Sequence, residues 1–113
     1  MVKKLVYLQP NWNNMRTRNY KRISAKLQEL RKTKQFNQKQ MAQTIGISEA
    51  MYSRIESGER AIQHSQIDVV AQILNADIIE LRSLNLADRI EEETKDYSKN
   101  EIAKAFNVLY RNK

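Results

Sequence analysis

The sequence of 113 residues predicts an all-α protein: a five-helix domain followed by a C-terminal helical extension and preceded by an N-terminal arm. Two observations predict the helices. Glycine occurs twice and proline once, which is too little turn chemistry for an all-β fold. Apolar residues also recur at helical spacing: Ile23, Leu27 and Leu30 share one face at i, i+4 and i+7.

The starts and ends of the helices are predicted from residues that favour helix termini. The first helix begins at about Tyr20, and the second and third end at Gly46 and Gly58, because a left-handed backbone is least costly for glycine. Side-chain oxygens that accept hydrogen bonds from free backbone N–H groups precede the other helices. The predicted caps are Asn37, Ser48, Ser65, Asp77 and Ser98, the last with Glu101 as a capping box.

The predicted organisation is residues 1–19 as the arm, 20–84 as the five-helix domain and 85–113 as the extension. The apolar start resembles a signal peptide, but Gln9, Pro10 and Asn11 interrupt it too early, and no run of transmembrane length follows. We therefore expect a cytoplasmic protein without a membrane partner.

The net charge of +7 is unevenly distributed. Residues 1–60 contain 13 Lys and Arg against 4 Asp and Glu, whereas residues 61–113 contain 7 against 9. A basic half of this kind favours contact with a polyanion, although a solvated basic surface has the same composition. A basic run precedes the first helix and either lies along a groove or belongs to a flexible tail. Its members are Arg16, Arg18, Lys21 and Arg22.

The sequence gives no indication of an enzyme. There is no cysteine, which excludes a disulfide framework or a thiolate metal site, and His64 is the single histidine. No glycine-rich phosphate loop or nucleophile motif occurs. The acidic run Glu91–Glu93 is typical of a solvated helix face. We expect neither a cofactor nor a metal.

The most informative segment is 38–57, which predicts two short helices joined by a tight turn at Gly46. Ala42 is small enough for the two helices to cross closely. The apolar residues Ile47, Tyr52 and Ile55 would hold the second helix on the core, leaving its opposite face outward. That face is small or hydrogen-bonding, as entry into a DNA groove requires. It comprises Ser48, Glu49, Ala50, Ser53, Arg54 and Ser57.

From about Ile23 to Leu84 the chain resembles the phage-repressor/Cro-like (Xre) class of helix-turn-helix transcription regulators. The similar segments are Leu27-Gln28-Glu29-Leu30-Arg31, Asn37-Gln38-Lys39-Gln40-Met41-Ala42 and Tyr52-Ser53-Arg54-Ile55-Glu56-Ser57-Gly58-Glu59-Arg60. The resemblance implies a structural ion pair between Arg31 and Glu56. Residues 51–60 and 84–88 also resemble controllers of restriction–modification operons.

By this resemblance, the recognition helix spans about 48–57 and inserts in the major groove of an operator. Arg54 would donate to guanine, and Ala50 would contact a thymine methyl group. Glu49 either accepts from cytosine or only stabilises the helix dipole. The implied base contacts are Ser48, Glu49, Ala50, Ser53 and Arg54, and the implied phosphate contacts are Gln38, Lys39, Ser57, Arg60 and Gln63.

The expected partners are double-stranded DNA and a second copy of the chain. Such regulators usually read two half-sites one helical turn, ~34 Å, apart. Residues 85–113 are the predicted dimerisation segment, and the alternative is that its apolar residues fold back on their own domain. The apolar residues in question begin just before this segment, at Leu84, and continue with Ala87, Ile90, Ile102, Phe106 and Leu109. The alternative function is that of an antitoxin, which binds DNA and neutralises a toxin through residues 85–113.

Overall fold

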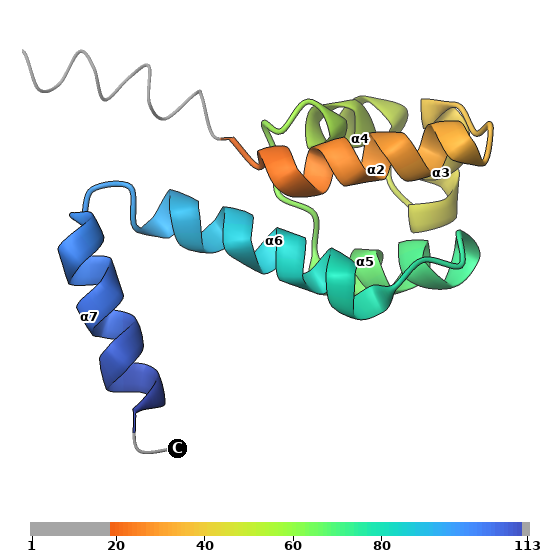
Figure 1. Ribbon diagram of the computed structural model, residues 1–113. Helices are drawn as coiled ribbons and strands as arrows, with labels where there is room; N and C mark the ends of the chain where they lie inside the picture. Colours follow the sequence, from red (N-terminus) through yellow and green to blue (C-terminus); the bar gives the residue numbers. More distant parts are fainter. Residues whose placement is uncertain (1–18, 112–113) are drawn as a thin grey trace, which may run out of the picture.

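The computed structural model describes residues 19–111, which form helices and no strand within that range (Figure 1). Its helices are α2 (Lys21–Thr33), α3 (Gln38–Ile45), α4 (Glu49–Glu56), α5 (His64–Ile73), α6 (Ile78–Glu93) and α7 (Lys99–Tyr110). The first five of these pack together, and α7 runs away from the end of α6. The all-α prediction is confirmed. No helix among the described residues is long and apolar enough to cross a membrane.

One apolar core holds the five packed helices together. Each of them contributes at least one side chain that is fully or almost fully buried, such as Leu27, Met41, Tyr52, Ile67 and Leu81. Burial of a large apolar side chain stabilises a fold by about 1.5–3 kcal/mol, so these contacts fix the relative positions of the helices.

Four of the five predicted caps are confirmed. The side chains of Asn37, Ser48, Asp77 and Ser98 each accept a backbone N–H from the first turn of the following helix. The prediction for Ser65 is wrong, because α5 begins one residue earlier, at His64, with Gln63 as its N-cap residue.

The start of α5 is set by a local exchange that the serine pattern does not reveal. The backbone N–H of Gln63 donates to Oε1 of Gln66 at 2.9 Å, which satisfies a donor just before the helix. A glutamine three residues after the cap has this function in a capping box.

The helix α6 extends beyond the predicted domain boundary. Residue 84 lies in the middle of α6, and both Asn85 and Asp88 are buried. The carboxylate of Asp88 accepts the backbone N–H of Arg22 at 3.2 Å and that of Ile23 at 2.8 Å, at the N-terminus of α2. The part of α6 after residue 84 therefore still packs on α2 through Asp88, and α7 follows α6 after a short turn.

The predicted arm falls mostly on residues 1–18, including Arg16 and Arg18, which lie outside the described residues. Arg22, the last member of the predicted basic run, forms ion pairs with Asp88 and Glu91. Its charge is compensated within the domain, which disfavours the groove contact considered for it. Asn19 donates its backbone N–H to Glu92 at 3.2 Å, so the chain enters the domain beside the end of α6.

Candidate nucleic-acid interface

The helices α3 and α4 form a compact two-helix unit around Gly46. This glycine has a φ of +85°, a left-handed conformation that closes α3. The N–H groups of Gly46 and Ile47 both donate to the carbonyl of Ala42, at 2.8 and 3.0 Å. Ala42 itself is buried, and its small side chain leaves room for the two helices to pack closely.

The two faces of α4 differ sharply in burial. Tyr52, Ile55 and Glu56 are buried in the domain. The opposite face is exposed and contains no large apolar side chain. All five predicted base contacts are exposed, namely Ser48, Glu49, Ala50, Ser53 and Arg54, and so is Ser57 at the end of the helix. The structure therefore brings these five residues together on one outward surface.

A charged network ties α4 to the two preceding helices. The structure brings Arg31 and Glu56 together: Arg31 Nε lies 2.5 Å from Glu56 Oε2, and Nη2 lies 3.2 Å from Oε1. The Tyr52 hydroxyl donates to Glu56 Oε2 at 2.6 Å, and Gln38 Nε2 donates to Oε1 at 3.0 Å. Glu56 is therefore an internal anchor of α4, and its carboxylate faces the domain interior.

The environment of Glu56 sets its ionisation. Burial acts to raise the pKa of the carboxyl group, but the hydrogen bonds from Arg31, Tyr52 and Gln38 outweigh burial and hold the pKa below its usual value. Burial and the adjacent carboxylate raise the pKa of Tyr52 far above its ordinary value. At neutral pH the network therefore consists of the ionised Glu56, the charged Arg31 and two neutral donors, Tyr52 and Gln38.

Four of the five predicted phosphate contacts are exposed around α4. Lys39 lies in the first turn of α3, and Ser57, Arg60 and Gln63 lie in the segment between α4 and α5 or at its ends. The Ser57 hydroxyl donates to the carbonyl of Arg54 at 2.9 Å, which fixes the end of α4.

The fifth, Gln38, is placed differently. Its side-chain amide is bound to Glu56, so the side chain is committed to the network, while its backbone N–H lies in the first turn of α3, where helices leave donors free. The contact of the Tyr52 hydroxyl with Glu56 was not predicted, although the two residues have the i, i+4 spacing of neighbours on one helix face. The contact of Gln38 with Glu56 spans 18 residues and has no local signal.

The basic residues of this surface differ from three arginines elsewhere in the domain. Arg22, Arg31 and Arg82 are all paired with carboxylates. Among the residues described, Lys39, Arg54 and Arg60 form no ion pair, which leaves their charges directed to solvent. The described residues also contain no group of His, Asp and Glu suited to a metal ion.

The comparisons with known proteins agree with this geometry. Residues 27–81 match the family model described as helix-turn-helix, from the second half of α2 to the first turn of α6. No curated protein and no solved structure matches the chain. The matched segment contains α3, α4 and the complete Arg31–Glu56 network. Residues 27–81 are therefore an Xre/Cro-like helix-turn-helix domain, the domain of a family of DNA-binding transcription regulators.

Proposed function

We propose that this regulator reads a specific operator by inserting α4 into the major groove. The observation that carries the proposal is the division of α4 into a buried face and an exposed face without bulky apolar groups. The major groove admits an α-helix and presents a different pattern of donors and acceptors for each base pair. A helix held rigidly from behind, as Glu56 holds α4, keeps its exposed side chains in register with those patterns.

The exposed side chains have distinct chemistry toward base edges. Arg54 offers a two-pronged donor to O6 and N7 of guanine, and Ala50 offers a methyl surface to thymine. Ser48 and Ser53 carry hydroxyl groups that suit either a base or a phosphate. Glu49 lies in the first turn of α4, where it either accepts from cytosine N4 or stabilises the helix dipole without touching DNA.

Contacts with DNA phosphates would hold α4 in a fixed position along the major groove. Lys39 on α3 and Arg60 in the segment after α4 supply charges that form no ion pair among the described residues, and Ser57 and Gln63 supply neutral polar groups. At the start of α3, the side chain of Asn37 accepts the N–H of Gln40, which leaves the N–H groups of the first two helical residues for a phosphate oxygen. In this account Gln38 meets the phosphate through its backbone.

We also propose that the protein acts as a dimer. One recognition helix contacts only a few base pairs, and two-fold dimers solve this by reading two half-sites on one face of the duplex. The functional division then places DNA recognition in the domain up to Glu93 and dimerisation in the apolar surface around α7.

The test is selection of bound duplexes from a random pool at a stated salt concentration, because phosphate contacts alone retain DNA without regard to sequence. The proposal predicts enrichment of an inverted repeat with two half-sites about one turn apart. Salt-sensitive retention with no enriched sequence would contradict operator reading while leaving DNA binding intact.

An antitoxin is the second candidate function. It is favoured by α7, which buries none of its residues and carries exposed apolar side chains such as Leu109 and Tyr110. A toxin would bind the same surface of α7 that a second copy of the chain would use. Purification from native cells distinguishes the two: an antitoxin carries a second small protein in fixed ratio, whereas a dimeric regulator is recovered as this chain alone.

A further inference from the structure

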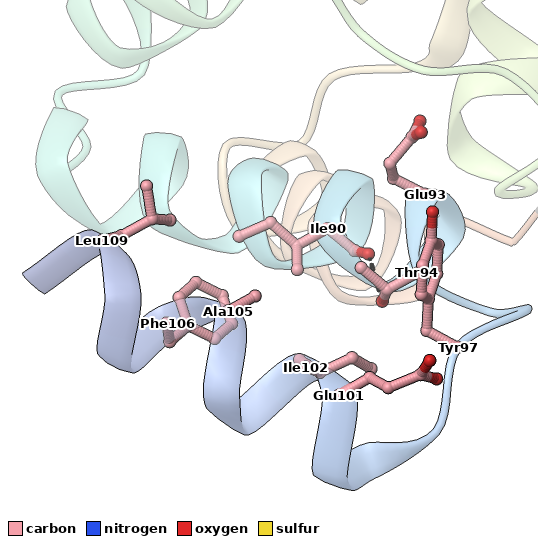
Figure 2. Close-up of a pocket in the computed structure, with 9 residues that line it drawn as sticks. All are labelled: Ile90, Glu93, Thr94, Tyr97, Glu101, Ile102, Ala105, Phe106 and Leu109. Carbon is pink, nitrogen blue, oxygen red and sulfur yellow. Dashed lines mark hydrogen bonds between the residues drawn. The ribbon is translucent and has the colours of Figure 1, made fainter.

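The end of α6 and the helix α7 enclose an open cavity with apolar walls. Figure 2 shows side chains of both helices directed into this space, whose volume is about 470 Å³. Ile90 of α6 lies on one wall. The other wall is formed by Ile102, Phe106 and Leu109, which share one side of α7 at i, i+4 and i+7. We call this space the α6–α7 cavity.

The helix α7 lacks packing among the described residues. None of its residues is buried, and a helix of 12 residues is marginal in water without packing. Its Ser98 cap contributes only about 1 kcal/mol. An element that filled the α6–α7 cavity would remove the apolar side of α7 from water and so stabilise the helix.

The polar part of the cavity lining is acidic. Glu93 and Glu101 line the cavity, and no lysine or arginine lies among the described residues that surround it. Neither carboxylate forms an ion pair within the described part of the chain. Glu101 accepts the backbone N–H of Ser98 at 2.8 Å, and this bond holds the pKa of its carboxyl group below the usual value. The cavity therefore fits an apolar occupant that carries positive charge.

The N-terminal segment of this chain has that chemistry. Residues 1–18 contain four basic residues and no acidic one. Lys3 and Lys4 stand directly before the apolar run Leu5-Val6-Tyr7-Leu8, whereas residues 9–18 are mostly polar. Two positive charges next to four apolar side chains match two carboxylates next to an apolar wall.

The chain enters the described structure beside the end of α6. The backbone N–H of Asn19 donates to Oε2 of Glu92 at 3.2 Å. Ile90 lies two residues from Glu92, which places it on nearly the opposite side of α6. Half the circumference of a helix is about 17 Å, and an extended chain advances about 3.3 Å per residue, so about six residues pass around α6. Residues 9–18 suffice for this path, and residues 3–8 then reach the cavity.

We infer that residues 3–8 occupy the α6–α7 cavity of their own chain, with the apolar run against α7 and the two lysines beside the two carboxylates. Attachment to the same chain gives the segment an effective concentration on the order of millimolar, which favours it over a free partner. In Figure 1 the cavity lies at the end of the molecule away from α3 and α4, so the exposed face of α4 remains free. Leu86 and Val108 do not line the cavity and stay exposed for a second copy.

The deciding measurement is the reactivity of a thiol in the cavity toward N-ethylmaleimide. The chain contains no cysteine, so Ala105→Cys introduces one thiol that lines the cavity, and Val108→Cys introduces one that does not. Each is made in the full chain with the natural segment and with the double substitution Leu5→Asp and Leu8→Asp. The double substitution should speed the reaction at position 105 about tenfold, the factor for a cavity that is otherwise open about a tenth of the time. The rate at position 108 should not change.

A charge-matched control separates loss of the apolar contacts from added charge. The double substitution Asn11→Asp and Asn13→Asp adds the same two charges to the N-terminal segment but keeps the apolar run. It should leave the thiol at position 105 protected, and circular dichroism of every variant reports that the domain is folded. If the rate at position 105 is the same with the natural segment and with Leu5→Asp and Leu8→Asp, residues 3–8 do not fill the cavity and the inference is overturned.

A mixing experiment identifies whose segment fills the cavity. The Ala105→Cys chain with Leu5→Asp and Leu8→Asp is unfolded and refolded together with an excess of wild-type chain, which has no thiol. The inference predicts that the fast reaction remains, because each cavity holds the segment of its own chain. Restored protection would show that a second copy provides the segment, which contradicts the inference.

This inference does not depend on operator reading, and the two can fail separately. The thiol rates are measured without DNA, so a chain that selects no operator can still show the tenfold difference at position 105. A chain that selects an operator but shows equal rates keeps its proposed function and loses this inference.

Discussion

Asp88 on α6 caps the N-terminus of α2 by accepting the backbone N–H of Ile23 at 2.8 Å, across 65 residues of sequence. The helix α2 begins after Tyr20 without a capping side chain of its own. The second carboxylate oxygen of Asp88 accepts the N–H of Arg22 and also pairs with its guanidinium. Asp88 is completely buried, so the carboxylate depends on these donors for its solvation.

We expect Asp88→Asn to lower the free energy of unfolding by about 2 kcal/mol, because the amide group accepts through one oxygen only and loses the charge. Urea unfolding followed by circular dichroism measures the loss. Asp68→Asn is the matched control, since Asp68 forms an ion pair with Arg82 on the surface and such pairs contribute at most about 1 kcal/mol. Equal losses in the two variants would contradict the capping role of Asp88.

Glu56 predicts a dependence of stability on pH. Its pKa is lower in the folded protein than in the unfolded chain, so the unfolded state binds more protons in this range. The stabilisation is therefore present above the unfolded pKa of about 4.3 and is lost as the pH falls through the lower folded pKa. Urea unfolding of the wild type should show a decrease in stability over this acid range.

The variant Glu56→Gln separates this contribution from those of the other carboxylates. We expect it to cost about 3 kcal/mol at neutral pH, because the mostly buried guanidinium of Arg31 loses its charged partner. The difference in stability between wild type and variant should shrink as the pH falls below about 4. A difference that stays constant from pH 7 to pH 3 would show that Glu56 does not titrate in this way.

The turn between α3 and α4 depends on the backbone of Gly46. A Cβ added there would meet no atom within 4 Å, so space is not the constraint, but the φ of +85° disfavours a side chain. We expect Gly46→Ala to destabilise the protein by about 1 kcal/mol and Gly46→Asn to destabilise it less, because asparagine tolerates this conformation better. Thermal unfolding checks the order, and an alanine variant as stable as the wild type would be inconsistent with strain at the turn.

The basic residues around α4 predict a salt effect on DNA binding. If Lys39 contacts a phosphate, Lys39→Ala should weaken binding to all sequences alike and reduce the slope of log K against log salt by about 1. Lys104→Ala removes the same charge from α7 and should leave the slope unchanged. Fluorescence anisotropy at several salt concentrations gives both slopes, and an unchanged slope for Lys39→Ala would remove this residue from the interface.

Local chemistry made much of the fold predictable. The caps at Asn37, Ser48 and Ser98 act on N–H groups three residues away, and the two glycines mark backbone positions that few other residues adopt. The face of α4 was also predictable, because the period of 3.6 residues separates Tyr52 and Ile55 from the exposed side chains.

What the sequence did not reveal depends on contacts distant along the chain. The capping of α2 by Asp88 and the bond from Gln38 to Glu56 join separate helices, and no local pattern marks them. The burial of Asn85 and Asp88 was not predictable for the same reason, since both are polar residues whose burial has no signature in hydropathy.

The central claim is that Arg54 reads a base while Arg60 only holds the backbone. The most direct test measures the affinity of wild type, Arg54→Ala and Arg60→Ala for the selected operator and for each of its symmetric single-base variants, at one salt concentration. Arg54→Ala should lose about 1–3 kcal/mol of discrimination at one base pair of each half-site, whereas Arg60→Ala should bind all duplexes more weakly by the same factor. If Arg54→Ala keeps the full base preference of the wild type, α4 does not read the operator through Arg54 and the claim is contradicted.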